Sequence, residues 1–417
     1  MLSFGRFARS RCASNMTDSV RDDLLAFRDE FPILARSNYL VSNSLGAMPR
    51  AVPDRLAEYA RQWGELGVRA WAKGWWEMPV RVGDVIAPLI GATTGSVSMQ
   101  PNVTVAQSIV LSAMDFSAGR DTIVMTELDF PSVRYAVEEL ARKLGARVVV
   151  VPSDDGLTID EGHLLQAIDE RVRLVCISHV LFKSAYIMDA NVICAHAHAM
   201  GAMVSLDAYH SVGVIPVDVV QSGVDFLTGG VLKWLCGGPG AAFLYASPSV
   251  RSKLEPALTG WQAHRQPFAF EQEMDYADGI ERWLTGTPSI ASLFAASEGP
   301  LIVKSAGMER IRAKSIRQTE WLIASADSRG YRVHAPRESG RRGGTVAFDV
   351  PHGREVAQYL LSRDIIVDYR VGAGIRVAPH FYTRDDELDA CIGAIDECVS
   401  TGEWKRFTEA AQAAIVT

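Results

Sequence analysis

The chain has 417 residues, of which 48% are hydrophobic and 22% are charged, and its formal net charge is −7. This length allows a large domain and a smaller one, and the composition is that of an ordinary globular protein. The negative charge disfavours nucleic acid or an anionic membrane as a partner. No apolar run approaches the roughly eighteen residues that predict a membrane span.

The N-terminus and the cysteines bear on location. Residues 1–17 contain three arginines, several serines and no acidic residue, a composition that can mimic a mitochondrial targeting peptide. The alternative is a ragged N-terminus, with Met16 as the true start. The six cysteines are scattered without a C-x-x-C pair, which indicates reduced thiols and no cysteine metal site. We therefore expect a cytoplasmic protein.

Two polar segments in the first part of the chain are candidate ligand sites. Residues 43–46 form a polar turn after the apolar run 39–41, although a simple loop explains them equally well. Residues 102–105 precede a helix expected over 106–114. Free amides at a helix N-terminus bind phosphate, and the Thr104 hydroxyl would add a donor. The alternative is an ordinary cap by Asn102 or Thr104.

Strand-like and helix-like runs alternate from residue 122 onward. We expect strands over residues 122–127, 147–152, 174–178 and 202–207, and helices over residues 132–144, 158–169 and 191–200. This alternation predicts an α/β fold with a mostly parallel sheet covered by helices. Ligands collect at the carboxyl ends of such strands, where Phe130, Ser178 and Asp207 fall. Phe130 is suited to stacking on a flat cofactor, although core packing is the usual role of phenylalanine.

A lysine and an aspartate carry the main chemical signal. Asp207 ends an apolar strand, and Lys233 follows an apolar run and precedes the glycine-rich turn 237–240. Such a lysine can hold pyridoxal 5'-phosphate as a Schiff base, while the aspartate keeps the pyridine nitrogen protonated. Burial would lower the pKa of Lys233. The alternatives are a structural lysine and a helix cap by Asp207. His210 could orient Asp207 or contact the phosphate, or be a core histidine.

The C-terminal third has a different pattern. Residues 289–325 predict a long, broken helical stretch, followed by strands over 345–350, 365–369 and 374–378 and helices over 355–362 and 385–398. This order predicts a small α+β domain. Arg376 lies in an apolar strand and needs an anionic partner, which is a substrate carboxylate or a structural ion pair. His196 and His198 lie two apart on a helix and point to different sides, so no metal site is expected.

These motifs, taken in order, resemble the kynureninase family, in the class V branch of the fold-type I enzymes that use pyridoxal 5'-phosphate. The resemblance runs from about Asn38 to Tyr382. The matching segments are residues 39–46, 103–104, 130–132, Ser178, Asp207 with His210, 233–240, 260–261, 286–287 and 374–379.

The resemblance implies a site and a subunit arrangement. We expect an N-terminal segment (1–50) that contributes to the small domain and the active site, a large cofactor-binding domain (51–288) and a small domain (289–417). The cofactor contacts it implies are Val103, Thr104, Phe130, Ser178, Asp207, His210, Lys233, Trp261 and Thr287. Asn43, Ser44 and Arg376 would bind the substrate. Residues 286–287 would come from the partner subunit of a homodimer.

The implied activity is hydrolysis of the Cβ–Cγ bond of a kynurenine-like amino acid, in tryptophan catabolism, to an anthranilate-type acid and alanine. Three positions depart from the family pattern. Leu232 stands where the family has a tyrosine that contacts phosphate and transfers protons, Val133 replaces an aspartate, and the segment 261–264 differs. A neighbour substitutes for the tyrosine, or the chemistry has changed.

Several alternatives remain open at this point. One is another class V enzyme: a C–S lyase or cysteine desulfurase, an epimerase or an aminotransferase. Leu232 disfavours a desulfurase, which usually has histidine there. Another is a regulatory or scaffold protein that binds the cofactor, which the combination of Lys233, Asp207 and Arg376 disfavours. The tryptophans at 71, 75 and 76 are suited to core packing or to an aromatic substrate pocket.

Overall fold

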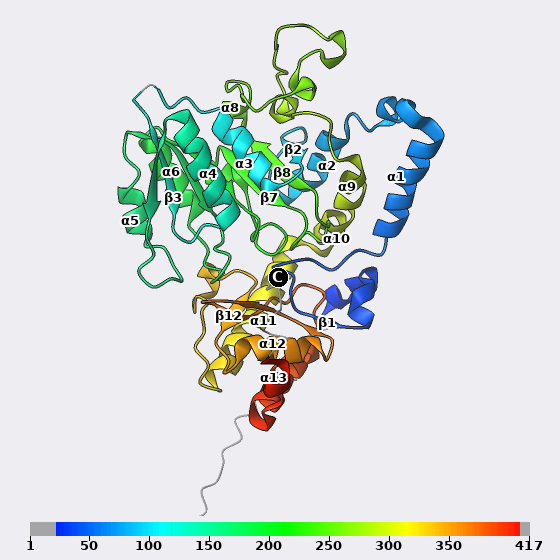
Figure 1. Cartoon of the computed structure of the whole chain (residues 1–417), viewed down its shortest axis with the longest axis vertical. Coiled ribbons are helices and arrows are strands. Elements are labelled where there is room, and N and C mark those ends of the chain that lie inside the picture. Colours follow the sequence, from blue (N-terminus) through cyan, green and yellow to red (C-terminus); the bar gives the residue numbers. More distant parts are fainter. Residues whose placement is uncertain (1–21, 118, 409–417) are drawn as a thin grey trace, which may run out of the picture.

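The computed structural model describes residues 22–117 and 119–408 and shows a large domain above a smaller one (Figure 1). The basic segment 1–17, considered above as a targeting peptide, lies outside the described residues. Within the described ranges, no helix has both the length and the apolar character that a membrane crossing requires.

The large domain is built on a seven-stranded sheet. Its strands, in spatial order, are β2 (Val97–Gln100), β8 (Ala242–Ala246), β7 (Phe226–Gly230), β6 (Met203–Asp207), β5 (Val172–Ser178), β3 (Thr122–Thr126) and β4 (Arg147–Val151). β8 runs antiparallel to both of its neighbours, and all other neighbouring pairs are parallel. The predicted fold class, α/β with a mostly parallel sheet, is confirmed.

Helices cover both faces of this sheet because side chains alternate along each buried strand. On β3, Ile123 and Met125 pack with α3 (Val103–Ser112) and α4 (Pro131–Leu144). Val124 points to the other face, where the core contains side chains of α2 (Met78–Ile86), α5 (Glu161–Gln166), α6 (Ala190–Ala199) and α9 (Ile290–Ala296). The remaining helices of this domain are α1 (Val52–Leu66), α7 (Val219–Ser222) and α8 (Pro248–Arg251).

The predicted helix bounds hold for α4 and α6 to within a residue or two, but not for α5. The pattern predicts a helix over 158–169, whereas α5 starts after Asp160, whose side chain caps the backbone N–H of His163 at 2.9 Å. The predicted stretch 289–325 is three helices: α9 (Ile290–Ala296), α10 (Glu298–Ala306) and α11 (Met308–Asp327). Gly307, with a φ of 85°, separates the last two.

The small domain contains a three-stranded antiparallel sheet and a two-stranded parallel one. The first has the order β11 (Asp368–Arg370), β12 (Gly374–Val377), β9 (Val346–Phe348), and the second pairs β1 (Asn38–Tyr39) with β10 (Ile365–Ile366). Helices α12 (Gly353–Leu361) and α13 (Asp385–Thr401), with the C-terminal part of α11, complete the domain. The single strand predicted over 365–369 is therefore two strands that belong to different sheets.

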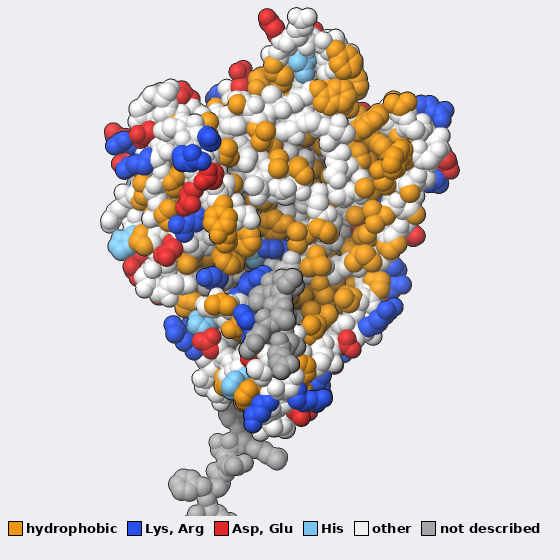
Figure 2. Space-filling view, viewed as in Figure 1, with side chains coloured by type: hydrophobic (Ala, Val, Ile, Leu, Met, Phe, Trp, Pro, Cys, Tyr) orange, Lys and Arg blue, Asp and Glu red, His pale blue; other side chains and the backbone are white. Residues whose placement is uncertain are grey.

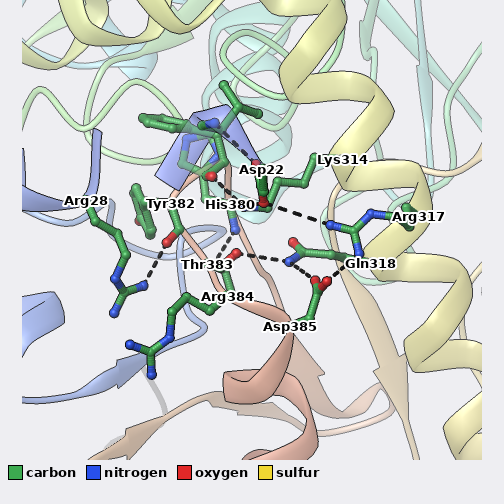
Figure 3. Close-up of polar contacts among 12 residues, drawn as sticks. Asp22, Arg28, Lys314, Arg317, Gln318, His380, Tyr382, Thr383, Arg384 and Asp385 are labelled. Atoms are coloured by element: carbon green, nitrogen blue, oxygen red, sulfur yellow. Dashed lines mark hydrogen bonds and ion pairs between the residues drawn. The ribbon is translucent and has the colours of Figure 1, made fainter. Parts of the chain in front are cut away.

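The N-terminal segment is held against the small domain. Arg28 pairs with Glu387 at 2.7 Å. It also donates to the carbonyl of Tyr382, and Lys314 of α11 forms an ion pair with Asp22 at 2.6 Å (Figure 3). Beyond β1, the N–H of Gly46 donates to the carbonyl of Leu232 at 2.7 Å. The chain from residue 22 to residue 46 thus connects the small domain with the lysine turn of the large one.

Candidate active site

One cavity of about 430 Å³ lies where the large domain, the small domain and the N-terminal segment meet. The predicted site residues that line it are Asn43, Ser44, Val103, Thr104, Phe130, Ser178, Asp207, His210, Lys233 and Arg376. The carboxyl ends of β5 and β6 supply Ser178 and Asp207. The structure therefore brings together all of the predicted site residues except Trp261 and Thr287.

Lys233 lies at the centre of this group. Its Nζ is 2.7 Å from Nε2 of His210, and it is 4.6 Å and 5.6 Å from the ring centroids of Tyr209 and Phe130. Burial lowers the pKa of Lys233 to about 7, with Arg376 and Arg370 acting in the same direction and Asp207 opposing them. A substantial share of Lys233 is therefore an unprotonated nucleophile near neutral pH.

Asp207 is buried at the end of β6. Its Oδ1 accepts a hydrogen bond from the backbone N–H of Tyr209 at 2.8 Å, and Oδ2 has no hydrogen bond within residues 22–117 and 119–408. Burial raises the pKa of Asp207 to about 6, which still leaves the carboxylate mostly ionised at neutral pH. A buried carboxylate needs a partner, and the protonated nitrogen of a pyridine ring supplies one. The site fits the expected cofactor at this end.

The other end of the cavity is the N-terminus of α3. Asn102 caps this helix by accepting from the N–H of Val105 at 3.0 Å. The cap leaves the N–H groups of Val103 and Thr104 without a hydrogen bond to the described part of the chain. Helix N-termini of this kind bind phosphate. Asn102 is therefore a cap, and the first amides of α3 stay available to an anion, so the predicted phosphate-binding role stays a prediction.

Separate contacts hold the Phe130 ring and the ends of the two strands β3 and β5 beside the cavity. The Phe130 side chain is 38% exposed, so it is not a core residue, and its ring meets Phe182 edge-on at 5.2 Å. Asp129 is buried and accepts from the N–H groups of Thr126, at 2.8 Å, and Ser178, at 2.6 Å. Asp129 thus fixes the ends of β3 and β5 relative to each other, beside the cavity.

Arg376 of β12 has a structural partner as well as a place in the cavity. Its guanidinium forms a buried ion pair with Asp368 of β11 and donates to the carbonyl of Phe182 at 2.7 Å. Its Nε is buried with no hydrogen-bond partner among the described residues. Both side-chain polar atoms of Asn43 are also buried and unpartnered there. These groups can receive the carboxylate and other polar atoms of a ligand.

Sequence reasoning missed several residues of the cavity. Tyr209, Phe182 and Arg370 line it, although none was predicted. Tyr209 lies between two predicted residues, Asp207 and His210, and that position was the available signal. Phe182 and Arg370 are placed by contacts between domains, which a single-chain pattern does not reveal.

Two predicted cofactor residues do not reach the cavity of their own chain. The ring of Trp261 packs against Trp76 at 4.8 Å and Phe268 at 5.7 Å. Thr287 lines a separate cavity of about 220 Å³ with Gln100 and other residues. The cluster at 71, 75 and 76 does not line the active-site cavity either, and Trp75 packs on Tyr59 at 5.3 Å.

Comparison with known proteins shows the family of this chain. Residues 39–386 match the family described as Aminotransferase class-V. The kynureninase of Burkholderia pseudomallei (strain 1106a) is 32% identical over 413 residues, which cover 95% of this chain and 97% of the relative. The kynureninase of Pseudomonas fluorescens is 33% identical over 399 residues, covering 92% and 94%.

Solved structures show the same fold. A cysteine desulfurase from Thermococcus onnurineus NA1 has a TM-score of 0.78 at 22% identity, covering 90% of this chain and 98% of its own. A C-DES variant with glycine linked to its PLP cofactor has a TM-score of 0.80 at 21% identity, covering 88% and 98%.

The fold, the lysine–aspartate pair and the family match define the chain as a class V enzyme that uses pyridoxal 5'-phosphate. Within that class it belongs to the kynureninase family and is an enzyme of the kynureninase type.

Proposed function

We propose that this enzyme hydrolyses the Cβ–Cγ bond of kynurenine-like amino acids and releases an anthranilate-type acid and alanine. The observation that carries the proposal is the joint presence in one cavity of Lys233, Asp207 and Arg376, in a chain aligned over nearly its whole length with kynureninases. The apolar side chains of Leu45, Val180 and Phe182 line the same cavity and suit an aromatic substrate.

The residues have separate roles in this proposal. The bound cofactor withdraws electrons from the α-carbon of the substrate. Asp207 would hold the pyridine nitrogen protonated, and the N-terminus of α3 with Thr104 would hold the phosphate. Lys233 would attach the cofactor and then take the α-proton, for which a pKa of about 7 is well matched. His210, whose Nε2 is 2.7 Å from Lys233 Nζ, would accept a hydrogen bond from that amine and stay neutral, because burial lowers the pKa of His210 well below its usual value.

The substrate carboxylate would bind at Arg376. The Asp368 ion pair and the Phe182 carbonyl fix the guanidinium, and the unpartnered Nε offers a donor. Ser44 Oγ lies 3.4 Å from an Arg376 nitrogen, and Asn43 adds an amide from the N-terminal segment. Holding the carboxylate fixes which α-carbon bond faces Lys233.

We also propose a homodimer in which Thr287, and with it Trp261, serves the active site of the partner. Neither residue reaches its own cavity. The projecting loop at the top of Figure 2 carries a concentration of hydrophobic side chains, and Trp261, Phe268 and Phe270 are 38%, 60% and 74% exposed. Exposed aromatic patches of this kind mark association surfaces, and a second copy is the proposed occupant.

The domain boundaries and the location are part of the proposal. We assign residues 1–50 to an N-terminal segment, 51–288 to the cofactor-binding domain and 289–417 to the small domain, with α9 forming the junction because its side chains pack in the core of the large domain. The contacts of Arg28 and β1 with the small domain support the first boundary. A cytoplasmic location remains a prediction from composition.

The test is a substrate panel. The purified enzyme with its cofactor would be given kynurenine, 3-hydroxykynurenine, cysteine and L-alanine in separate reactions. Every product would be identified by mass, and the two enantiomers of alanine would be separated by chiral chromatography. We expect both kynurenines to be cleaved. Turnover of cysteine with release of sulfur, and of neither kynurenine, would replace the proposal with a C–S lyase; racemised alanine would indicate an epimerase.

A further inference from the structure

Leu232 and Tyr209 line the same cavity as Lys233. Position 232 is where the kynureninase pattern has a tyrosine, and leucine cannot donate a hydrogen bond. The backbone of Leu232 is fixed by the hydrogen bond from Gly46 at 2.7 Å. A phenol that acts at this part of the cavity must therefore come from another residue.

Tyr209 occupies the required place. Its ring lies against the backbone of Gly230, two residues before Leu232, and a Cβ at Gly230 would overlap the phenol. The ring also packs against the hydrophobic cluster that contains Val103 and Ala106 of α3. Tyr209 thus contacts the segment that leads to Lys233 and packs in the same hydrophobic cluster as α3.

The hydroxyl of Tyr209 is available to a ligand. It makes no hydrogen bond within the part of the chain that the structure describes, whereas the backbone N–H of Tyr209 is held by Asp207 at 2.8 Å. Burial, and secondarily Asp207, raises the pKa of the phenol. The group therefore stays a protonated donor near neutral pH.

We propose that Tyr209 donates a hydrogen bond to the phosphate of the cofactor and so replaces the tyrosine that is missing at position 232. In this proposal the phenol comes from the second residue after the aspartate and not from the residue before the lysine, and both positions line the cavity. This inference rests on the cofactor site within the proposed function, but not on the identity of the substrate.

The test compares two ligands of the apoenzyme, pyridoxal 5'-phosphate and pyridoxal, which lacks the phosphate. We expect Tyr209→Phe to raise the Kd for pyridoxal 5'-phosphate by about ten- to a hundredfold, the effect of one hydrogen bond to a charged group. The Kd for pyridoxal should stay unchanged. Tyr135→Phe is the matched control, because Tyr135 lies on α4 and is 65% exposed; it should change neither value.

A second variant asks whether the position of the phenol matters. Adding Leu232→Tyr to Tyr209→Phe should restore the affinity for pyridoxal 5'-phosphate, which a purely structural role of Tyr209 does not predict. Equal losses for both ligands, or no loss for either, would overturn the proposal. Thermal unfolding of each apoenzyme verifies that the variants are folded. Because no substrate is used, failure here is distinguishable from failure to cleave kynurenine.

Discussion

Arg376 and Asp368 face each other on the neighbouring strands β12 and β11, and their side chains form an ion pair that is almost completely buried. Asp368 also accepts from the hydroxyl of Ser44 at 2.9 Å. The N-terminal segment and the small domain therefore meet at this pair. Arg376 is both a structural residue and the candidate carboxylate site, so its two roles can be tested separately.

Asp368→Asn removes the charged partner and leaves the guanidinium of Arg376 buried. We expect the free energy of unfolding to fall by about 3–5 kcal/mol, the usual result of breaking a buried pair from one side. Urea unfolding of the apoenzyme measures it. The matched control is Glu403→Gln, which breaks the exposed pair with Arg406 and should give no measurable change. Similar small changes in both variants would show that the buried pair contributes little.

The rate at which the apoenzyme attaches its cofactor should depend on the protonation of Lys233. Only the neutral amine attacks the aldehyde, and burial places the pKa of Lys233 at about 7. The rate should therefore rise with pH through about 7 and level off above it, as followed by the visible absorbance of the attached cofactor. A rate that keeps rising towards pH 10, as for an ordinary lysine, would contradict the effect of burial.

Asp207→Asn should separate binding from chemistry. The variant keeps Lys233 and the phosphate site, so we expect it to bind the cofactor and turn yellow. Loss of the charge opposite the pyridine nitrogen should lower kcat by about 10²–10³, the effect of removing one preorganised electrostatic group. Asp218→Asn, at the N-cap of α7, is the control and should keep full activity. If Asp207→Asn also keeps full activity, Asp207 has no electronic role.

Mixed dimers test whether the active site is shared between subunits. Lys233→Ala and Thr287→Ala chains would be purified separately, then unfolded and refolded together. If Thr287 serves the partner, one site of each mixed dimer is intact, and activity should return to about one quarter of the wild-type value in an equimolar random mixture. No recovery above the separate variants would show that Thr287 acts only within its own chain, or not at all.

The sequence predicts which residues stand at the strand ends of the site. It does not predict the residues that pack around those strand ends. Asp207 and Ser178 could be placed because buried parallel strands carry a continuous apolar signal. β7 was missed because Gly229 and Gly230 are typical of turns. In the structure a side chain at either position would overlap a ring, that of Phe243 or of Tyr209. Such requirements come from residues distant in sequence, and local patterns do not contain them.

In the small domain, too, local sequence patterns do not show which segments will pair. The run 365–369 reads as one strand, and it splits because residues 365–366 pair with the N-terminal segment, whereas Asp368 pairs with Arg376. Phe182 and Arg370 line the cavity because segments that are distant in the sequence pack together there. Trp261 and Thr287 do not line the cavity of their own chain. Their predicted cofactor contacts therefore require a second chain.

The most direct test of the central claim is product analysis with kynurenine as the only substrate. The enzyme loaded with pyridoxal 5'-phosphate should release anthranilate and alanine in equal amounts, and Lys233→Ala should release neither. Kynurenine left intact by the yellow wild-type enzyme, or alanine formed without anthranilate, would contradict hydrolysis of the Cβ–Cγ bond.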